Sequence, residues 1–187
     1  MKILTGNLKG RTINFKPNSH VRPTADKVRK AIFDTLQSID FSNARFLDLF
    51  SGSGAVGLEA LSQGALFATF VEQNRAQAVG IEKNLENIGL ADKAKVFSED
   101  VFKAIEKLST KGKSYDIIFL DPPYEKDLGI RALQALVISD ILAKDARVIL
   151  EANKREAAPQ VIGGLKLTCE KVYGDTKLFF YTVLKSL

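Results

Sequence analysis

Between residues 45 and 152, short apolar runs alternate with amphipathic segments, and this alternation constrains the fold more than any other feature of the sequence. The apolar runs have the length and composition of buried strands, and the segments between them have the periodicity of helices. Strands of this kind form a parallel sheet that helices cover on both faces, with right-handed crossovers. The predicted strands are residues 45–50, 66–72, 95–98, 115–120 and 146–151, and the predicted helices are residues 55–63, 74–87, 101–108 and 127–139.

After residue 152 the pattern changes to two strands without a helix between them. Residues 165–173 and 176–184 flank Gly174-Asp175, a dipeptide typical of tight hairpin turns. The sequence therefore predicts a seven-stranded sheet, with five parallel strands followed by a C-terminal antiparallel pair.

Residues 1–44 are predicted to form a separate hairpin and helix ahead of the sheet domain at residues 45–187. Residues 2–5 and 12–15 flank a glycine-containing turn and predict a small hairpin. Thr24 is a candidate cap for a helix that continues to about residue 39. Its predicted apolar face carries Val28, Ile32, Leu36 and Ile39, and its predicted polar residues are Lys27, Arg29 and Lys30.

The positive charge of the chain is concentrated at its beginning. The formal net charge is +5, and residues 1–45 hold nine basic and three acidic residues. Such asymmetry indicates either contact with a polyanion or a solvated basic surface, and charge alone leaves both open.

The sequence offers little material for redox, metal or membrane chemistry. Its one cysteine, Cys169, permits no intrachain disulfide, and Cys169 with the one histidine, His20, gives no metal-ligand set. We expect an inert Cys169, no metal, and a monomer in the cytoplasm. No apolar run has the length of a membrane span, and the N-terminus has no signal-peptide pattern.

A glycine turn follows the first strand of the sheet domain. Gly52, Gly54 and Gly57 fit the pattern G-x-G-x-x-G, and Glu72 lies 20 residues after Gly52, at the end of the next strand. Glycines allow positive φ angles and a close approach of backbone to a ligand, and an acid at this spacing can accept hydrogen bonds from ribose hydroxyls. The turn predicts an adenine-nucleoside cofactor, although a tight strand–helix turn alone would need the same glycines.

Two acidic residues help to choose between cofactors. Asp48 ends the first strand, where a carboxylate would repel the pyrophosphate of NAD but attract the cationic amine of S-adenosylmethionine. Asp100 follows the third strand and can accept from the adenine amino group, although it can also cap the helix that starts at Val101. These residues favour S-adenosylmethionine.

Asp121-Pro122-Pro123-Tyr124 follows the fourth strand. Two prolines fix φ and remove two backbone donors, so the turn is stiff and can hold reacting groups at the carboxyl end of the sheet. The Asp121 carboxylate and the Pro122 carbonyl can accept hydrogen bonds from an exocyclic base amine, and Tyr124 offers a ring on which a base can stack. A rigid turn with a capping aspartate is the alternative.

Together these residues resemble a known family over nearly the whole chain. The chain is similar to the bacterial 16S rRNA guanine-N2 methyltransferases that modify guanine 966. The resemblance rests on residues 6–11, on Arg22-Pro23-Thr24 with the residues up to Arg29, on the glycine turn from Asp48 to Gly57, on Leu58-Glu59-Ala60-Leu61, on Val71-Glu72 and on Asp121-Pro122-Pro123-Tyr124. It departs from the family pattern at Lys30, where the family has glutamate, and at Asp34, where it has asparagine.

The resemblance implies a class I methyltransferase fold, S-adenosylmethionine as cofactor, and 16S rRNA as partner, either as naked RNA or within an assembling small subunit. It implies that Asp121, Pro122, Pro123 and Tyr124 hold the target guanine. With their neighbours, the candidate cofactor-binding residues are Asp48, Phe50, Ser51, Gly52, Gly54, Glu72, Gln73, Asp100 and Val101. The candidate RNA-binding residues are Lys9, Arg11, Arg22, Thr24, Lys27 and Arg29.

Three other functions are compatible with parts of the sequence. A DNA adenine or cytosine amino methyltransferase would share the Asp121 turn, but such enzymes usually carry a target-recognition region, and no long insertion interrupts the sheet pattern. An NAD-dependent oxidoreductase would explain the glycines and Glu72 but not Asp48 or the Asp121 turn. An inactive RNA-binding protein has no chemical reason to keep both Asp121 and Tyr124.

Overall fold

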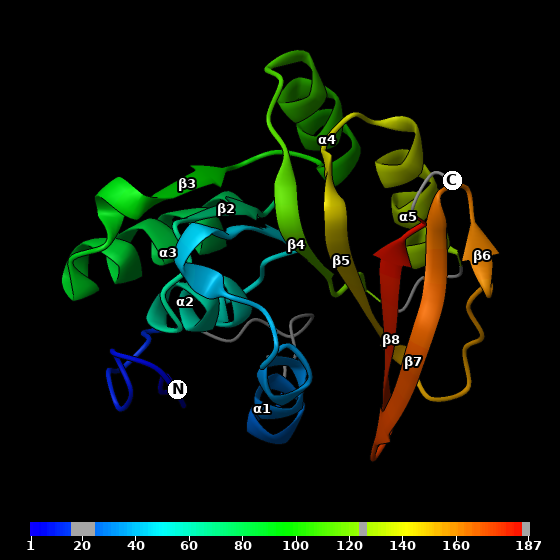
Figure 1. The fold of residues 1–187 in the computed structure, drawn as a ribbon. Coiled ribbons are helices and arrows are strands. Elements are labelled where there is room, and N and C mark those ends of the chain that lie inside the picture. Colours follow the sequence, from blue (N-terminus) through cyan, green and yellow to red (C-terminus); the bar gives the residue numbers. More distant parts are fainter. Residues whose placement is uncertain (16–24, 124–126, 185–187) are drawn as a thin grey trace.

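A computed structural model describes residues 1–15, 25–123 and 127–184 of the 187-residue chain. These residues form an eight-stranded sheet in the order β3-β2-β1-β4-β5-β8-β7-β6 (Figure 1). β1 to β5 are parallel, and β8, β7 and β6 continue the sheet in antiparallel pairs. The strands are β1 (Arg45–Leu49), β2 (Phe67–Val71), β3 (Ala94–Phe97), β4 (Tyr115–Leu120), β5 (Leu142–Asn153), β6 (Val161–Ile162), β7 (Leu165–Tyr173) and β8 (Thr176–Val183).

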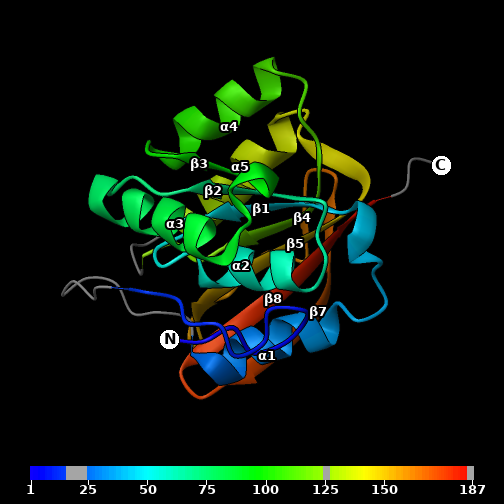
Figure 2. The same ribbon diagram turned by 90° about the vertical axis from the view of Figure 1, so that its left-hand side faces the viewer.

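Helices cover both faces of this sheet (Figure 2). One buried cluster joins the sheet to α1, α2 and α3, and we call this side the α1–α3 face. The other cluster joins the sheet to α4 and α5, on the α4–α5 face. The α-helices are α1 (Asp26–Thr35), α2 (Ala55–Ser62), α3 (Arg75–Ile88), α4 (Val101–Thr110) and α5 (Leu128–Ile138), and the short 3-10 helices are η1 (Phe41–Asn43) and η2 (Ala91–Lys93).

Local sequence signals explain where α3 begins and ends. The Asn74 side chain accepts hydrogen bonds from the backbone of Ala76 and Gln77, and this satisfies donors that the first turn of α3 leaves open. Gly89 ends α3 in the left-handed region, with φ of 75°. The helix predicted at residues 74–87 is thereby confirmed as α3. In the described part of the chain, no helix is long and apolar enough to cross a membrane.

The structure corrects the predicted hairpin at the N-terminus. Residues 2 and 12 form one isolated antiparallel bridge rather than two strands. The chain between them also bonds to α2: the backbone of Leu4 and Thr5 donates to the Glu59 carboxylate, and Leu8 N–H donates to the Ser62 hydroxyl at 3.0 Å. The two arms still exchange backbone bonds, from Ile3 N–H to Arg11 O at 3.0 Å and from Ile13 N–H to Met1 O at 2.9 Å, so the predicted hairpin is present in a shorter form that α2 anchors.

Other boundaries differ in smaller ways. The helix expected to continue to residue 39 ends at Thr35, and its N-cap position is Ala25, while Thr24 lies outside the described residues. β6 adds an eighth strand of two residues to the seven predicted, and β5 begins at Leu142 rather than at residue 146. The predicted class of fold is confirmed.

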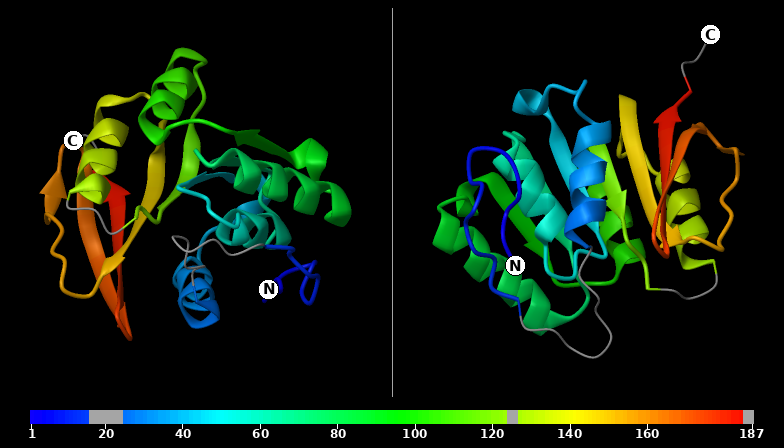
Figure 3. Two further views of the ribbon diagram at one scale, coloured as in Figure 1. Left: turned by 180° about the vertical axis from the view of Figure 1, so that it is seen from behind. Right: turned by 90° about the horizontal axis from the view of Figure 1, so that it is seen from below.

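The N-terminal residues pack onto the same core as the sheet domain. Ile3 and Ile13 are fully buried in the cluster of the α1–α3 face, together with Val28 and Ile32 of α1. The Asn84 side chain on α3 donates to Asn14 O and accepts from Asn14 N–H, each at 2.9 Å. α1 lies beside α2 on this face (Figure 3).

Candidate active site

The carboxyl edge of the sheet gathers three carboxylates on one face. Side chains alternate along a strand, and Leu47 and Leu49 belong to the cluster on the α4–α5 face, so Asp48 points to the α1–α3 face. Glu72 and Asp121 continue the same alternation just beyond Val71 and Leu120. Because β2 and β4 flank β1 on either side, the three acids converge around the end of β1.

The glycine turn connects β1 to α2 directly above this edge. Ser51 ties it to β2: its N–H donates to Val71 O at 2.9 Å, and its hydroxyl accepts from Val71 N–H at 3.0 Å. Gly52 and Gly54 have φ of 53° and 72°, and Phe50 has φ of 60°, a conformation that is costly for a bulky side chain. Strain of this kind is typical of functional turns that the surrounding structure holds in place.

Gly57 has a packing role rather than a conformational one. A Cβ at this position would lie 2.3 Å from Cε1 of the buried Phe70 ring, closer than real contacts allow. The first turn of α2 can therefore reach the sheet only with glycine here, and this close approach brings the Gly57 N–H to Asp48.

Asp48 lies beneath the first turn of α2 and is 1% exposed. Its Oδ2 accepts a hydrogen bond from Gly57 N–H at 2.9 Å. Burial raises the pKa of Asp48 well above its ordinary value, against the lowering effect of this bond, and the negative charges of Asp121 and Glu72 raise it further. The site thus concentrates negative charge in a poorly solvated place, which a cationic ligand would relieve.

Glu72 bridges the glycine turn and the start of α3. Its Oε2 accepts from Gly52 N–H at 2.8 Å and its Oε1 accepts from Asn74 N–H at 2.7 Å. Burial raises the pKa of Glu72, and these two bonds lower it. Each carboxylate oxygen has a second lone pair, so the side chain can also accept from a ligand.

The other predicted cofactor residues lie at the same edge with different exposures. Gln73 is exposed, next to Glu72. Asp100 follows β3, and its Oδ1 accepts from Phe102 N–H at 2.9 Å and from Lys103 N–H at 3.2 Å, so the helix-capping role is present. Val101 is 4% exposed and packs on the α4–α5 face.

α5 packs against the turn that follows β4. Pro122 is buried, Asp121 is partly buried and Pro123 is exposed. A Cβ on Gly129 would lie 3.4 Å from Pro122 Cγ and 2.9 Å from Leu150 Cδ1, so glycine lets α5 approach both. Tyr124 lies outside the described residues.

The predicted RNA-binding residues do not all lie on the surface. Lys9, Arg11 and Lys27 are exposed, and Lys27 Nζ lies 6.0 Å from the centre of the Tyr173 ring, at the end of β7. Arg22 and Thr24 lie outside the described residues. Arg29 is 0% exposed, which contradicts its prediction as an RNA contact.

Arg29 is buried because α1 turns it toward α2. Its Nη2 donates to Lys2 O at 2.7 Å and to Asp26 Oδ1 at 3.0 Å, and its Nε lies 3.4 Å from Glu59 Oε2. Arg29 precedes the buried Ile32 and Phe33 by three and four residues, so helical spacing places it on the apolar face. That spacing, with Glu59 as the one charge in α2, was the signal available in the sequence.

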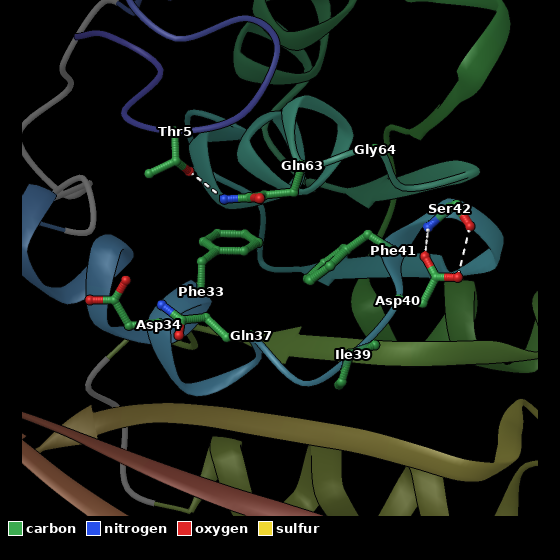
Figure 4. Close-up of a pocket in the computed structure, with 10 residues that line it drawn as sticks. All are labelled: Thr5, Phe33, Asp34, Gln37, Ile39, Asp40, Phe41, Ser42, Gln63 and Gly64. Carbon is green, nitrogen blue, oxygen red and sulfur yellow. Dashed lines mark hydrogen bonds between the residues drawn. The ribbon is translucent and has the colours of Figure 1, made fainter.

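A separate cavity of about 420 Å³ opens at the opposite edge of the sheet (Figure 4). Its wall includes η1 and Gly64, which precede β1 and β2, so it lies at their amino ends. Two of its polar side chains bond to their neighbours: Gln63 donates to the Thr5 hydroxyl at 2.6 Å, and Asp40 accepts from Ser42. The cavity is therefore distinct from the acidic edge.

Comparisons with known proteins agree with this arrangement. A family model described as Conserved hypothetical protein 95 matches residues 1–182. The chain is 34% identical to Ribosomal RNA small subunit methyltransferase D of Escherichia coli strain K12, over 97% of this chain and 89% of that protein. It is 32% identical to the Putative rRNA methyltransferase YlbH of Bacillus subtilis, over 97% and 98% respectively.

A solved structure is similar over the whole length. The Putative methyltransferase yhhF from Escherichia coli superimposes with a TM-score of 0.85 at 33% identity, covering 100% of this chain and 99% of that chain. The chain has the class I methyltransferase fold, and it belongs to the Conserved hypothetical protein 95 family, which it shares with the bacterial ribosomal RNA small subunit methyltransferases D.

Proposed function

We propose that this protein transfers a methyl group from S-adenosylmethionine to the exocyclic N2 amine of a guanine in small-subunit ribosomal RNA, at guanine 966. The observation that carries the proposal is the convergence of Asp48, Glu72 and Asp121 beside the glycine turn. The names of the two relatives support ribosomal RNA as substrate. The choice of guanine N2 rests on the sequence resemblance.

The acidic edge fits a cationic cofactor. S-adenosylmethionine carries an ammonium and a sulfonium, and it supplies a methyl group activated for transfer. The mutual repulsion of Asp48, Glu72 and Asp121 favours such a ligand and opposes a pyrophosphate. We assign the cofactor amine to the Asp48 side of the turn, the ribose hydroxyls to Glu72, and the adenine to Asp100 and Val101. Phe50, Ser51, Gly52, Gly54 and Gln73 complete the wall.

The Asp121 turn would hold the target amine. The lone pair of an exocyclic base amine is delocalised into the ring, so the amine is a poor nucleophile. Acceptors on both N–H groups, from the Asp121 carboxylate and the Pro122 carbonyl, favour a pyramidal nitrogen whose lone pair faces the methyl group. Asp121 would then take the proton that the nitrogen loses as the bond from nitrogen to the methyl carbon forms and the bond from that carbon to the cofactor sulfur breaks, which leaves the sulfur as a neutral thioether. The rest of the rate enhancement comes from alignment.

Three exposed cations give the enzyme its RNA contacts in this proposal. Lys9 and Arg11 lie on the N-terminal turn that α2 anchors, and Lys27 lies near the carboxyl end of the sheet. Contacts of this kind with phosphates position the substrate and weaken with salt. Substitution of each by glutamine should lower RNA affinity and reduce its salt dependence.

The test is transfer of labelled methyl from S-adenosylmethionine to small ribosomal subunits, naked ribosomal RNA and DNA from cells that lack this protein. Mass mapping then identifies the product nucleoside. N2-methylguanosine at one small-subunit position is the expected product. Label in DNA as methyladenine or methylcytosine, with none in RNA, would replace the proposal by the DNA amino methyltransferase that the same edge also suits.

A further inference from the structure

Glu151 is a buried carboxylate that the proposed mechanism does not use. It lies near the end of β5 and is 4% exposed. Val148 and Leu150 belong to the α4–α5 face and Ile149 to the α1–α3 face, so alternation turns Glu151 toward the α1–α3 face. This is the face on which Asp48, Glu72 and Asp121 converge.

The sheet register brings Glu151 level with Asp121. Leu120 of β4 pairs with Leu150 of β5, so the next residue of each chain is Asp121 and Glu151. Neighbouring strands lie about 4.8 Å apart, and the two side chains point the same way. On its other side Glu151 pairs with Leu178 of β8, so it occupies an interior strand rather than the sheet margin.

Burying a carboxylate in this position is costly unless polar partners compensate. An apolar side chain would fill the strand end at a lower cost, since Ile149 and Leu178, the neighbours of Glu151 on the α1–α3 face, are both buried in the core. An ionised carboxylate has about four acceptor positions, so interactions within the protein leave capacity for a ligand. A carboxylate beside the turn that holds the target amine can accept a hydrogen bond from another group on the same edge of the base.

We propose that Glu151 is the residue that selects guanine, by accepting a hydrogen bond from guanine N1–H while Asp121 and the Pro122 carbonyl hold N2. This inference rests on the function proposed above. Guanine presents N1–H and N2–H side by side on its Watson–Crick edge. Adenine and cytosine present a ring-nitrogen acceptor beside their exocyclic amine instead, and a second carboxylate repels that acceptor. The pair Asp121 and Glu151 therefore accepts guanine N2 and rejects adenine N6 and cytosine N4.

The experiment crosses a protein variant with a substrate variant. Wild-type protein and Glu151→Met are assayed on two RNAs that differ only at the target position, which holds either guanosine or 2-aminopurine riboside. 2-Aminopurine keeps the exocyclic amine but has no N1–H. We expect Glu151→Met to lower kcat/KM on guanosine RNA about 100-fold, because the buried N1–H loses its acceptor. On 2-aminopurine RNA the same substitution should cost less than about threefold.

Controls separate this role from a structural one. Glu151→Gln keeps the shape and a neutral acceptor, and its loss on guanosine RNA should be intermediate. Glu170→Gln removes one negative charge from an exposed position on β7 and should change neither rate. Cofactor affinity and the urea midpoint of each variant show whether the fold is intact.

The possible outcomes test different parts of the reasoning. Equal losses on the two RNAs, for Glu151→Met and Glu151→Gln alike, would show that Glu151 only supports the fold or the turn, and would overturn the inference. If the wild-type protein methylates no guanine in RNA, the proposed function itself fails. If it methylates guanine N2 and the losses are equal, the function stands and this role of Glu151 does not.

Discussion

Replacing Arg29 by methionine tests whether the N-terminal segment is anchored by a buried charge pair. Arg29 and Glu59 are 0% and 1% exposed, and Nε lies 3.4 Å from Oε2. Removing one member of such a pair costs about 3–5 kcal/mol, because the other charge stays buried. Glu59 keeps its bonds from the backbone of Leu4 and Thr5, so we expect a loss near 3 kcal/mol, about a third of the stability of an average domain.

The assay is equilibrium unfolding in urea at neutral pH. The matched control is Lys30→Met, which removes an exposed pair with Asp34 from the same helix and should cost about 0.5 kcal/mol or less. The double variant Arg29→Met/Glu59→Gln removes both charges and should lose at least about 1 kcal/mol less than the sum of the single losses. A loss below about 1 kcal/mol for Arg29→Met, or strictly additive losses, would refute the buried pair as the anchor.

The acidic edge and the glycine turn give three further predictions. Burial raises the pKa of Asp48 above its ordinary 3.8, so the unfolded chain releases this proton at lower pH than the folded protein. Stability without cofactor should therefore fall as pH rises through that interval, and Asp48→Asn should flatten the curve and weaken S-adenosylmethionine binding; unchanged unfolding curves would contradict this. Glu72→Gln should weaken cofactor binding, measured by calorimetry, about tenfold. Because burial raises the pKa of Glu72, the affinity of the wild-type protein should begin to fall on acidification at a pH above 4.5, the ordinary pKa of this group. Gly57→Ala should lower the free energy of unfolding by about 2 kcal/mol, because the new methyl group collides with the Phe70 ring. Gly80→Ala, where no atom lies within 4 Å of the new methyl group, should raise it by about 0.5 kcal/mol, and equal effects would argue against the packing role of Gly57.

The parallel core could be predicted because its signals are local. β4 and β7 match their predicted bounds because each is an apolar or alternating run with turn residues at its ends. Asp100 could be predicted as the cap of α4 for the same reason. β6 consists of two residues, too short to give a periodic signal, and it forms through its pairing with β7.

The N-terminal region was harder because tertiary contacts decide it. The arms of the expected hairpin exchange only a few backbone bonds, and Glu59 and Ser62, more than 50 residues away, accept from the backbone between those arms. Arg29 was assigned to a polar face by residue type, and its helical spacing with Ile32 and Phe33 was outweighed by its charge.

Three acids of the candidate site could be predicted from the sequence, whereas the fourth, Glu151, could not. Asp48, Glu72 and Asp121 lie at the carboxyl ends of the first, second and fourth apolar runs, so the parallel sheet brings them to one edge. Glu151 also ends such a run, but it lacks a turn motif after it, and its importance follows only from the register of Leu120 with Leu150 and from its burial.

The central claim is that the glycine turn holds the cofactor while the Asp121 turn acts on the base. The most direct measurement compares Asp121→Ala with wild type in two assays, S-adenosylmethionine binding by calorimetry and methyl transfer to small-subunit RNA. We predict that transfer falls at least about 100-fold, because both acceptor and proton carrier are lost, while cofactor affinity stays within about threefold. Parallel loss of binding and transfer, or transfer near the wild-type rate, would contradict the claim.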